Sequence, residues 1–341
     1  MTEKHYGGAA GFGAKSQTVK TNKIISQDKS EKTLKTDKTD NLNDNKSSMN
    51  DFNKYIKAGK IASETVKYAR TIIKPGMPLL EIAEKIEAKI LELGAKPAFP
   101  VNLSINEIAA HSTPSFNDAA AASGLLKVDI GVHIDGYIAD NAFSLDMENS
   151  EENKNLIKAA ESALNSALDK FKIGAKLSEI GKVIEESIKK SGFQPIINLS
   201  GHSVDVFNLH AGITIPNYNN SQEKIIAEGT YAIEPFTTSG HGSVRDGRSS
   251  GIYALEKEGS VRDGFAREVL VFIAEEYRTL PFCSRWIYKK FGSRGLLALK
   301  RIEEARLLHH YPQLIEISGK KVAQAEHTVL LTDKEKIITT L

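Results

Sequence analysis

The sequence predicts a mixed α/β domain in which two helices followed by a β-sheet occur twice. A helical pattern begins at Asp51 and a second covers residues 79–93, ahead of a strand-rich region. Two further helical patterns, residues 152–171 and 177–191, precede a second strand-rich region. Within the first region, two β-rich runs flank an Asp-Gly pair, which is a strong hairpin signal. This order indicates an internal duplication without sequence identity.

Composition limits the class of protein. With 341 residues, 40% of them hydrophobic, the chain can bury a sizeable core. Its net charge is +2; residues 1–50 carry 9 Lys against 6 acidic residues, so the rest has a net charge of −1. A nearly neutral folded part does not indicate a general nucleic-acid-binding protein. The absence of a membrane-length apolar run and of a signal sequence predicts a cytoplasmic protein without a membrane anchor.

The chain has one cysteine, Cys283, in the apolar context LPFCSRW. A single cysteine excludes an internal disulfide and a thiolate zinc cluster, and it fits a reducing compartment. We expect Cys283 to be a small buried hydrophobic residue.

Residues 1–48 are predicted to be a disordered tail rich in Lys, Asn, Asp and Ser. Residues 26–48 contain almost no apolar side chains, so folding could not offset the loss of chain entropy. The alternative is a short, mildly basic arm that contacts RNA or a ribosome. The folded domain is accordingly placed at residues 49–341.

The remaining elements follow from local pattern. After the second helical pair we expect a strand at 195–199, a loop at 200–202, and strands near 207–211 and 230–236. Residues 263–309 have helical periodicity, which predicts a helical insertion at about 260–310. The final motif VAQAEHTVLL alternates as a strand does.

Asp129 and Asp140 are predicted to lie on one face of the hairpin. With Asp135-Gly136 as the turn, Gly131 faces Asp140, and Asp129 lies on the same face two residues away from Gly131. Two carboxylates on one face repel each other unless a cation compensates. Because the flanking residues are apolar, we interpret the pair as part of a cation site rather than a solvated surface.

Three later residues extend this site. His202 follows a predicted strand, and Glu234 lies in YAIEPF, where the proline ends the strand ladder. Glu326 lies in VAQAEHTVLL on the face shared by Gln324 and Thr328. Each of the three taken singly is more often structural than a ligand. Their joint occurrence in apolar strands, where a lone charge needs a partner, favours a metal site.

Four carboxylates and one imidazole form an oxygen-rich ligand set. Such a set suits paired Mn, Fe, Co or Zn ions better than a structural zinc. Two adjacent ions lower the pKa of a shared water and stabilise an oxyanion. His111 and His210 lie in loop-like segments, where an imidazole can hydrogen-bond a scissile amide. An ordinary hydrogen-bonded histidine is the alternative at both positions.

These motifs resemble those of the methionine aminopeptidases, and specifically the type II branch of archaea and eukaryotes. The matching segments follow one another from about residue 57 to the C-terminus: AFPVNLSINEIAAHSTP, VDIGVHIDGYIADNAF, LSGHSVDVFNLHAGITIPN, YAIEPF, TLPFCSRW and AQAEHT. The resemblance implies the pita-bread fold, a pseudo-twofold ααββ duplication with a metal pair at its centre. It also implies the inserted helical subdomain that distinguishes type II from type I.

The resemblance implies a role for each ligand. Asp129 would bind one metal ion, Asp140 and Glu326 would bridge two, and His202 and Glu234 would complete the other. The two divalent ions, Co, Mn, Fe or Zn, would activate a hydroxide for attack on the peptide bond. Glu234 would be general base on the water and then general acid toward the leaving amine.

Substrate contacts are implied in the same way. His210 would contact the scissile carbonyl oxygen, His111 would lie near the scissile bond, and Phe99 would line the methionine pocket. Two departures from the family pattern concern substrate range rather than the metal ligands: Ala325 replaces a common phenylalanine, and Ser112 replaces a common tyrosine.

The implied activity is removal of the initiator methionine from nascent polypeptides by a monomeric, cytoplasmic metallo-aminopeptidase. One alternative is an X-Pro dipeptidase or aminopeptidase of the same fold, although the stretch LSGHSVDVFNLHAG does not match its expected motif. The other is a non-enzymatic relative that binds ribosomes or RNA, although all five ligand residues are present.

Overall fold

The computed structural model describes the backbone of residues 40–341 and the side chains of residues 51–341. Residues Met49–Leu341 form one compact unit. Helix α1 (Asp40–Ile72) begins within the segment assigned to the tail. The disorder predicted for residues 1–39 lies outside the described residues, and the boundary at residue 48 remains a prediction.

The first half consists of two helices that cover a β-sheet. Helix α2 (Leu79–Glu92) follows α1, and its Ile82, Ile86 and Ile90 recur every fourth residue and are fully buried. They pack with apolar residues of α1 and of the central strand of this sheet. The sheet has four strands: β1 (Lys96–Pro97), β2 (Asn102–Ile105), β4 (Leu125–Ile134) and β5 (Tyr137–Asp146).

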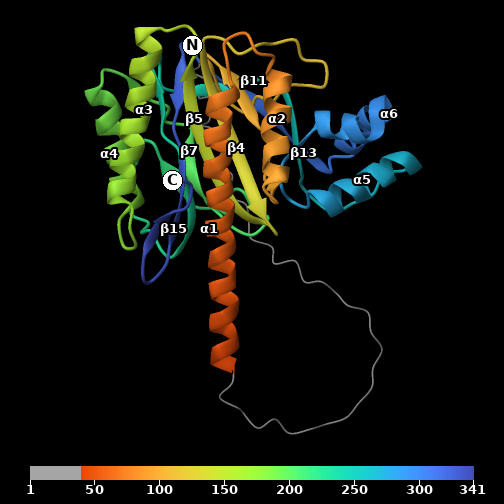
Figure 1. Cartoon of the computed structure of the whole chain (residues 1–341), viewed down its shortest axis with the longest axis horizontal. Helices are drawn as coiled ribbons and strands as arrows, with labels where there is room; N and C mark the ends of the chain where they lie inside the picture. The colour runs from red at the N-terminus through yellow and green to blue at the C-terminus, as the bar shows by residue number, and fades with distance from the viewer. Residues whose placement is uncertain (1–39) are drawn as a thin grey trace, which may run out of the picture. The chain divides into compact units, whose positions relative to one another are not determined.

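The second half repeats this arrangement. Helix α3 (Glu151–Lys170) starts at Ser150, whose side chain accepts a hydrogen bond from the backbone of Asn153, and α4 (Leu177–Lys190) follows. Both helices pack on a second sheet, and Figure 1 shows them side by side. That sheet is built from β7 (Ser200–Val204), β8 (Thr214–Pro216), β9 (Gly229–Ile233), β15 (His327–Leu331) and β16 (Lys336–Ile338). The predicted order of two helices and then a sheet, twice over, is confirmed.

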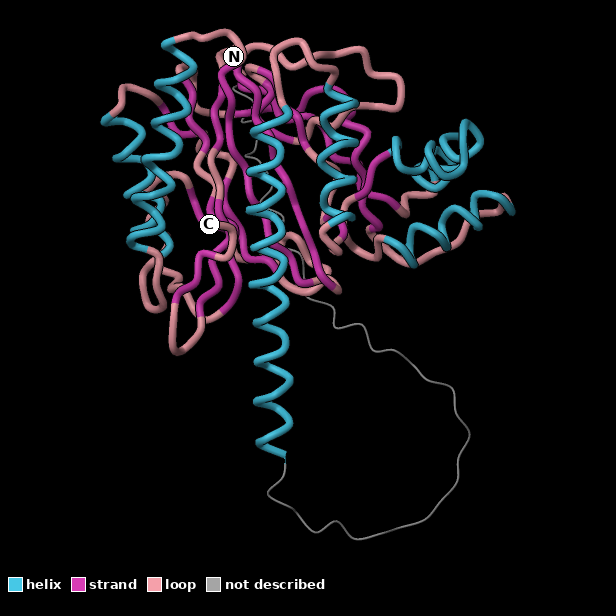
Figure 2. Tube along the Cα trace, viewed as in Figure 1, coloured by secondary structure: helices cyan, strands magenta, loops and turns pink. Residues whose placement is uncertain are grey.

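A small three-stranded sheet is formed by strands that adjoin strands of the second sheet in the sequence. It pairs β14 (Val322–Gln324) with β10 (Phe236–Thr238), and β10 with β6 (Gln194–Pro195). Strands occupy the interior of the folded unit, and helices lie on its outside (Figure 2). Strands from both halves therefore meet in the interior of the folded unit, and the helices lie outside them.

Three local predictions in the second half are wrong. The strand expected at 195–199 is limited to Gln194–Pro195, and the loop expected at 200–202 belongs to β7. Residues 207–211 form turns rather than a strand. Local composition did not predict β7, because this strand forms by pairing with β8 and β9, which come later in the chain.

The predicted helical stretch 263–309 contains two helices, α5 (Gly264–Glu276) and α6 (Ser284–Glu304). They pack together on another four-stranded sheet, and Figure 1 shows them side by side. The strands of that sheet are β3 (Ile108–Ala110), β11 (Val244–Leu255), β12 (Phe282–Cys283) and β13 (Leu308–Glu316).

A buried ion pair joins this helical region to the first half. Both terminal nitrogens of Arg285, at the start of α6, donate to the Glu87 carboxylate of α2 at 2.7 Å. Trp286 Nε1 donates to the same carboxylate at 2.9 Å, and Arg285 Nε donates to the Pro114 carbonyl. A bidentate pair with these further bonds fixes the geometry of α6 on α2.

Cys283 is fully buried, and burial raises the pKa of its thiol to about 12. The thiol is therefore protonated at neutral pH, which agrees with its predicted role as a small core residue. Within residues 40–341, no helix is long and apolar enough to span a membrane.

Candidate functional site

The predicted hairpin is confirmed residue by residue. Strands β4 and β5 pair in the expected register, with Gly131 opposite Asp140 and Asp129 opposite Ala142. Asp135 and Gly136 have φ values of 51° and 91°, as a two-residue turn with positive φ at both positions requires. Asp129 and Asp140 consequently lie on the same face of the sheet.

The other three predicted ligands come from the second half and from the C-terminal segment. His202 lies within β7, paired with Ala232 of β9. Glu234 lies between β9 and β10, where the chain leaves one sheet for the next. Glu326 lies between β14 and β15, so the final motif is two strands rather than one, and its backbone N–H donates to the Ala142 carbonyl.

These residues converge although they are far apart in sequence. One ligand atom each of Asp140, His202 and Glu326 lies within 4.8 Å of the others, and all three side chains are buried. His202 Nε2 is 3.8 Å from Asp140 Oδ2 and 3.6 Å from Glu234 Oε1. Asp129 is close enough to Asp140 for the two carboxyls to share a hydrogen bond.

The electrostatics of this cluster are unfavourable without a cation. Burial, followed by repulsion from neighbouring carboxylates, raises the pKa values of Asp140, Glu234 and Glu326 well above their usual range. Burial also raises the pKa of Asp129 to about 7 and lowers that of His202, which favours its neutral, metal-ligating form.

Buried polar atoms normally have hydrogen-bond partners. Here both carboxylate oxygens of Glu326 and the Oδ1 atoms of Asp129 and Asp140 are buried and have none. Four unpaired oxygens and one imidazole nitrogen at this spacing match the ligands of a hard divalent cation. The residues therefore fit a divalent metal.

His210 lies beside this cluster, and His111 is near enough to His210 for the two imidazoles to interact electrostatically. The His210 ring is 4.5 Å from the His202 ring, edge to face. His111 packs against the Tyr311 ring at 5.3 Å, and burial lowers its pKa to about 4. Its φ of 56° is uncommon for a residue with a side chain, and such backbone conformations cluster at functional sites.

Phe99 fills the space left by Gly131 on the sheet face. A Cβ atom added at Gly131 would lie 2.2 Å from the Phe99 ring, which is nearly fully buried. Gly131 therefore admits the ring of Phe99 beside Asp129 and Asp140, rather than leaving an empty gap between the two carboxylates. The alternation of the hairpin predicted the face but could not predict this neighbour.

Several residues of the site were not singled out from the sequence. Thr328 Oγ1 accepts from the Asp140 N–H and donates to the Asp140 carbonyl, both at 2.7 Å. Gln324 Nε2 donates to Glu234 Oε2. In the sequence, the strand face that Gln324 and Thr328 share with Glu326 was the signal that could have identified these two residues. Tyr311 lies on β13, a strand that the sequence pattern did not predict.

Ala325 packs in the apolar core under α3 and α4. Ala325 therefore lies against the helical layer, whereas the neighbouring Glu326 belongs to the carboxylate cluster.

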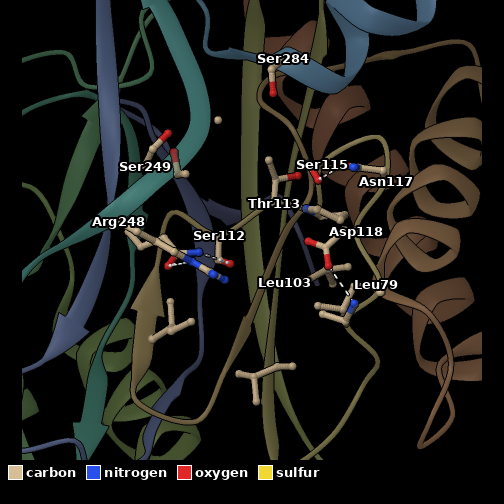
Figure 3. A pocket seen from close by; sticks show the side chains of 18 of the residues that line it. Leu79, Leu103, Ser112, Thr113, Ser115, Asn117, Asp118, Arg248, Ser249 and Ser284 are labelled. Atoms are coloured by element: carbon tan, nitrogen blue, oxygen red, sulfur yellow. Dashed lines mark hydrogen bonds between the residues drawn. The ribbon is translucent and has the colours of Figure 1, made fainter.

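A cleft of about 580 Å³ is separate from this cluster, since none of the five predicted ligands lines it. Its lining includes Leu103 and Ile105 of β2 and Leu79 of α2. On its wall Arg248 donates to Gln313, and Gln313 donates to Ser112 (Figure 3).

The fold and the buried carboxylate–histidine cluster define a metallopeptidase. The sequence profile of metallopeptidase family M24 matches residues 53–333, and the chain belongs to that family. Its pita-bread fold agrees with solved structures. A thermophilic Arx1 has a TM-score of 0.73 at 14% identity, covering 84% of this chain and 90% of the other. A methionine aminopeptidase from Thermotoga maritima has a TM-score of 0.62 at 22% identity, covering 85% and 96%.

Curated relatives narrow the assignment to the methionine aminopeptidases of archaea. The methionine aminopeptidase of Pyrococcus abyssi is 46% identical over 85% of this chain and 99% of its own length. That of Pyrococcus horikoshii is 45% identical over 85% of this chain and 99% of its own. The two solved structures, at lower identity, support the fold alone.

Proposed function

We propose that this protein is a metallo-aminopeptidase that removes the N-terminal methionine from nascent polypeptides in the cytoplasm. The observation that carries the proposal is the buried Asp140, His202 and Glu326 cluster, whose unpaired oxygens need a cation. Methionine specificity is supported by the close match to curated methionine aminopeptidases along nearly their full length.

The five clustered side chains would hold two divalent ions, Co, Mn, Fe or Zn. Asp140 and Glu326, at the centre of the cluster, would bridge both ions, Asp129 would complete one, and His202 and Glu234 would complete the other. When bound, the ions supply a water of lowered pKa and stabilise negative charge on the carbonyl oxygen.

Glu234 is the residue best placed to move the proton. Its Oε1 lies 3.6 Å from His202 Nε2, and 14% of its side chain is exposed, whereas Glu326 is almost fully buried. Glu234 would take a proton from the attacking water and then deliver it to the leaving amine. The pKa of Glu234 is raised, and a carboxylate needs a raised pKa to accept and return a proton in this way.

The substrate would be positioned by residues at the edge of the cluster. Neutral imidazoles at His210 and His111 can hydrogen-bond the scissile carbonyl or its amide. Phe99, packed against Gly131 on the carboxylate face, would line the pocket for the methionine side chain.

A peptide panel tests this function. Protein stripped of metal and reloaded with Mn, Co or Fe is expected to release methionine from Met-Ala-Ser and to leave Ala-Pro intact. Metal content is measured on the same sample, so that failed loading is recognised. Cleavage of Xaa-Pro dipeptides with Met-Ala-Ser left intact would instead favour the X-Pro peptidase, and no cleavage by fully loaded protein would favour the non-enzymatic relative.

Replacing Gly131 by Ala is expected to displace Phe99, because the new Cβ would overlap its ring. Overpacking of this kind costs about 1–3 kcal/mol of stability. We also expect a higher KM for Met-Ala-Ser, measured with the urea midpoint. Gly264→Ala is the control, since a Cβ there meets only the end of Arg267 at 3.8 Å. An unchanged midpoint and KM in the Gly131 variant would show that the close contact has no consequence.

A further inference from the structure

The backbone of Gln324 is hydrogen-bonded to the first half of the protein and lies beside a strand of the second half. Ser144 of β5, in the first half, donates from its hydroxyl to the Gln324 carbonyl at 2.8 Å and accepts from its N–H at 2.9 Å. On the other side, Gln324 pairs with Phe236 of β10, two residues after Glu234. The residue is only 1% exposed, so its position is closely determined.

The side chain of Gln324 extends toward the carboxylate cluster. Its Nε2 donates to Glu234 Oε2 at 3.3 Å, while the other carboxylate oxygen, Oε1, lies 3.6 Å from His202 Nε2. Hydrogen bonding from the same side chain lowers the pKa of Asp129, against the larger effect of burial. One amide thus acts on a carboxylate from each half of the molecule.

We propose that Gln324 is a positioning residue whose amide holds Oε2 of Glu234, so that Oε1 is directed at the metal cluster and its water. A carboxylate can rotate about its terminal bond, and this orientation is not set by packing alone. The amide N–H holds the oxygen that is turned toward it and thereby fixes the plane of the Glu234 carboxylate, which leaves the second oxygen facing the cluster.

This inference rests on the proposed function, and it differs from a packing role in a measurable way. If Gln324 only filled space, methionine, which has a similar shape and no amide donor, would serve as well. If its amide orients Glu234, loss of the donor should affect turnover and metal binding more than substrate binding.

The test compares Gln324→Met and Gln324→Leu with the wild-type chain. Both side chains are of similar volume, carry no charge and have no amide donor. Both variants are expected to lower kcat on Met-Ala-Ser by about 10- to 100-fold and to weaken Mn(II) binding in calorimetry by a similar factor. KM should stay within about twofold, since the substrate pocket is unchanged. Circular dichroism establishes that each variant is folded, and either folded variant suffices.

Thr238→Val is the matched control, because Thr238 donates to the Lys321 carbonyl within the same small sheet and does not touch the cluster. It should lose stability but keep its kcat and Mn(II) affinity. A folded Gln324 variant with kcat and Mn(II) affinity within about threefold of wild type would overturn the proposal. If wild-type protein fails to cleave Met-Ala-Ser, the proposed function fails, and the Mn(II) affinities still decide whether Gln324 positions Glu234.

Discussion

Glu234→Gln is expected to lower kcat on Met-Ala-Ser by about 10²- to 10⁴-fold, the usual contribution of a general acid–base residue. Glutamine keeps the shape of the side chain and cannot exchange a proton with the attacking water. The fold should survive, because Glu234 lies in the connection between β9 and β10 and the substitution replaces it with a neutral side chain of the same shape. Steady-state kinetics with saturating Mn(II) measure the effect, and calorimetry separates it from loss of metal.

The matched control is Glu185→Gln on α4. The Glu185 carboxylate accepts hydrogen bonds from Lys189 and from the backbone of Asn219, and it is not one of the clustered carboxylates. The Glu185→Gln substitution removes one negative charge, as Glu234→Gln does, and should leave kcat unchanged. Full activity in a metal-loaded Glu234→Gln protein would assign proton transfer to another group.

Removal of the metal is expected to abolish turnover and to destabilise the fold. An ion bound only by the native state at a free concentration 1,000 times its Kd contributes about 4.1 kcal/mol at 25 °C. Urea unfolding with EDTA and with Mn(II), at one pH, measures the difference. Equal midpoints in the two conditions, on protein shown to bind Mn(II), would mean that the cluster is not where the ion binds.

Asp140→Asn should stabilise the metal-free protein and remove most of the stability that the metal adds. The folded-state pKa of Asp140 is raised by burial, then by Asp129 and Glu234, so its favourable contribution is present at low pH and is lost as pH rises through that pKa. At pH 8 without metal, the neutral Asn variant should therefore unfold at higher urea than wild type. It should gain little from Mn(II) and show no turnover, and a less stable metal-free variant would contradict the repulsion inferred here.

Sequence reasoning succeeded where structure depends on neighbours along the chain. The periodicity of Ile82, Ile86 and Ile90 predicts one buried face of α2, and the Asp135-Gly136 turn predicts which residues of β4 and β5 share a face. It failed at β7 and β13, where pairing with strands distant in sequence outweighs local composition. The break between β14 and β15 has the same cause, since Glu326 bonds the backbone of β5 there.

By itself, the sequence determined that two helices precede a sheet in each half and that Asp129 and Asp140 share a face. Through family motifs it also identified His202, Glu234 and Glu326 as candidate ligands. Only the tertiary structure decided that these five side chains meet, that Phe99 occupies the space at Gly131, and that Gln324 contacts Glu234. The physical reason is that each such contact joins different strands or loops, whose relative positions depend on the packing of the sheets and helical layers rather than on local periodicity.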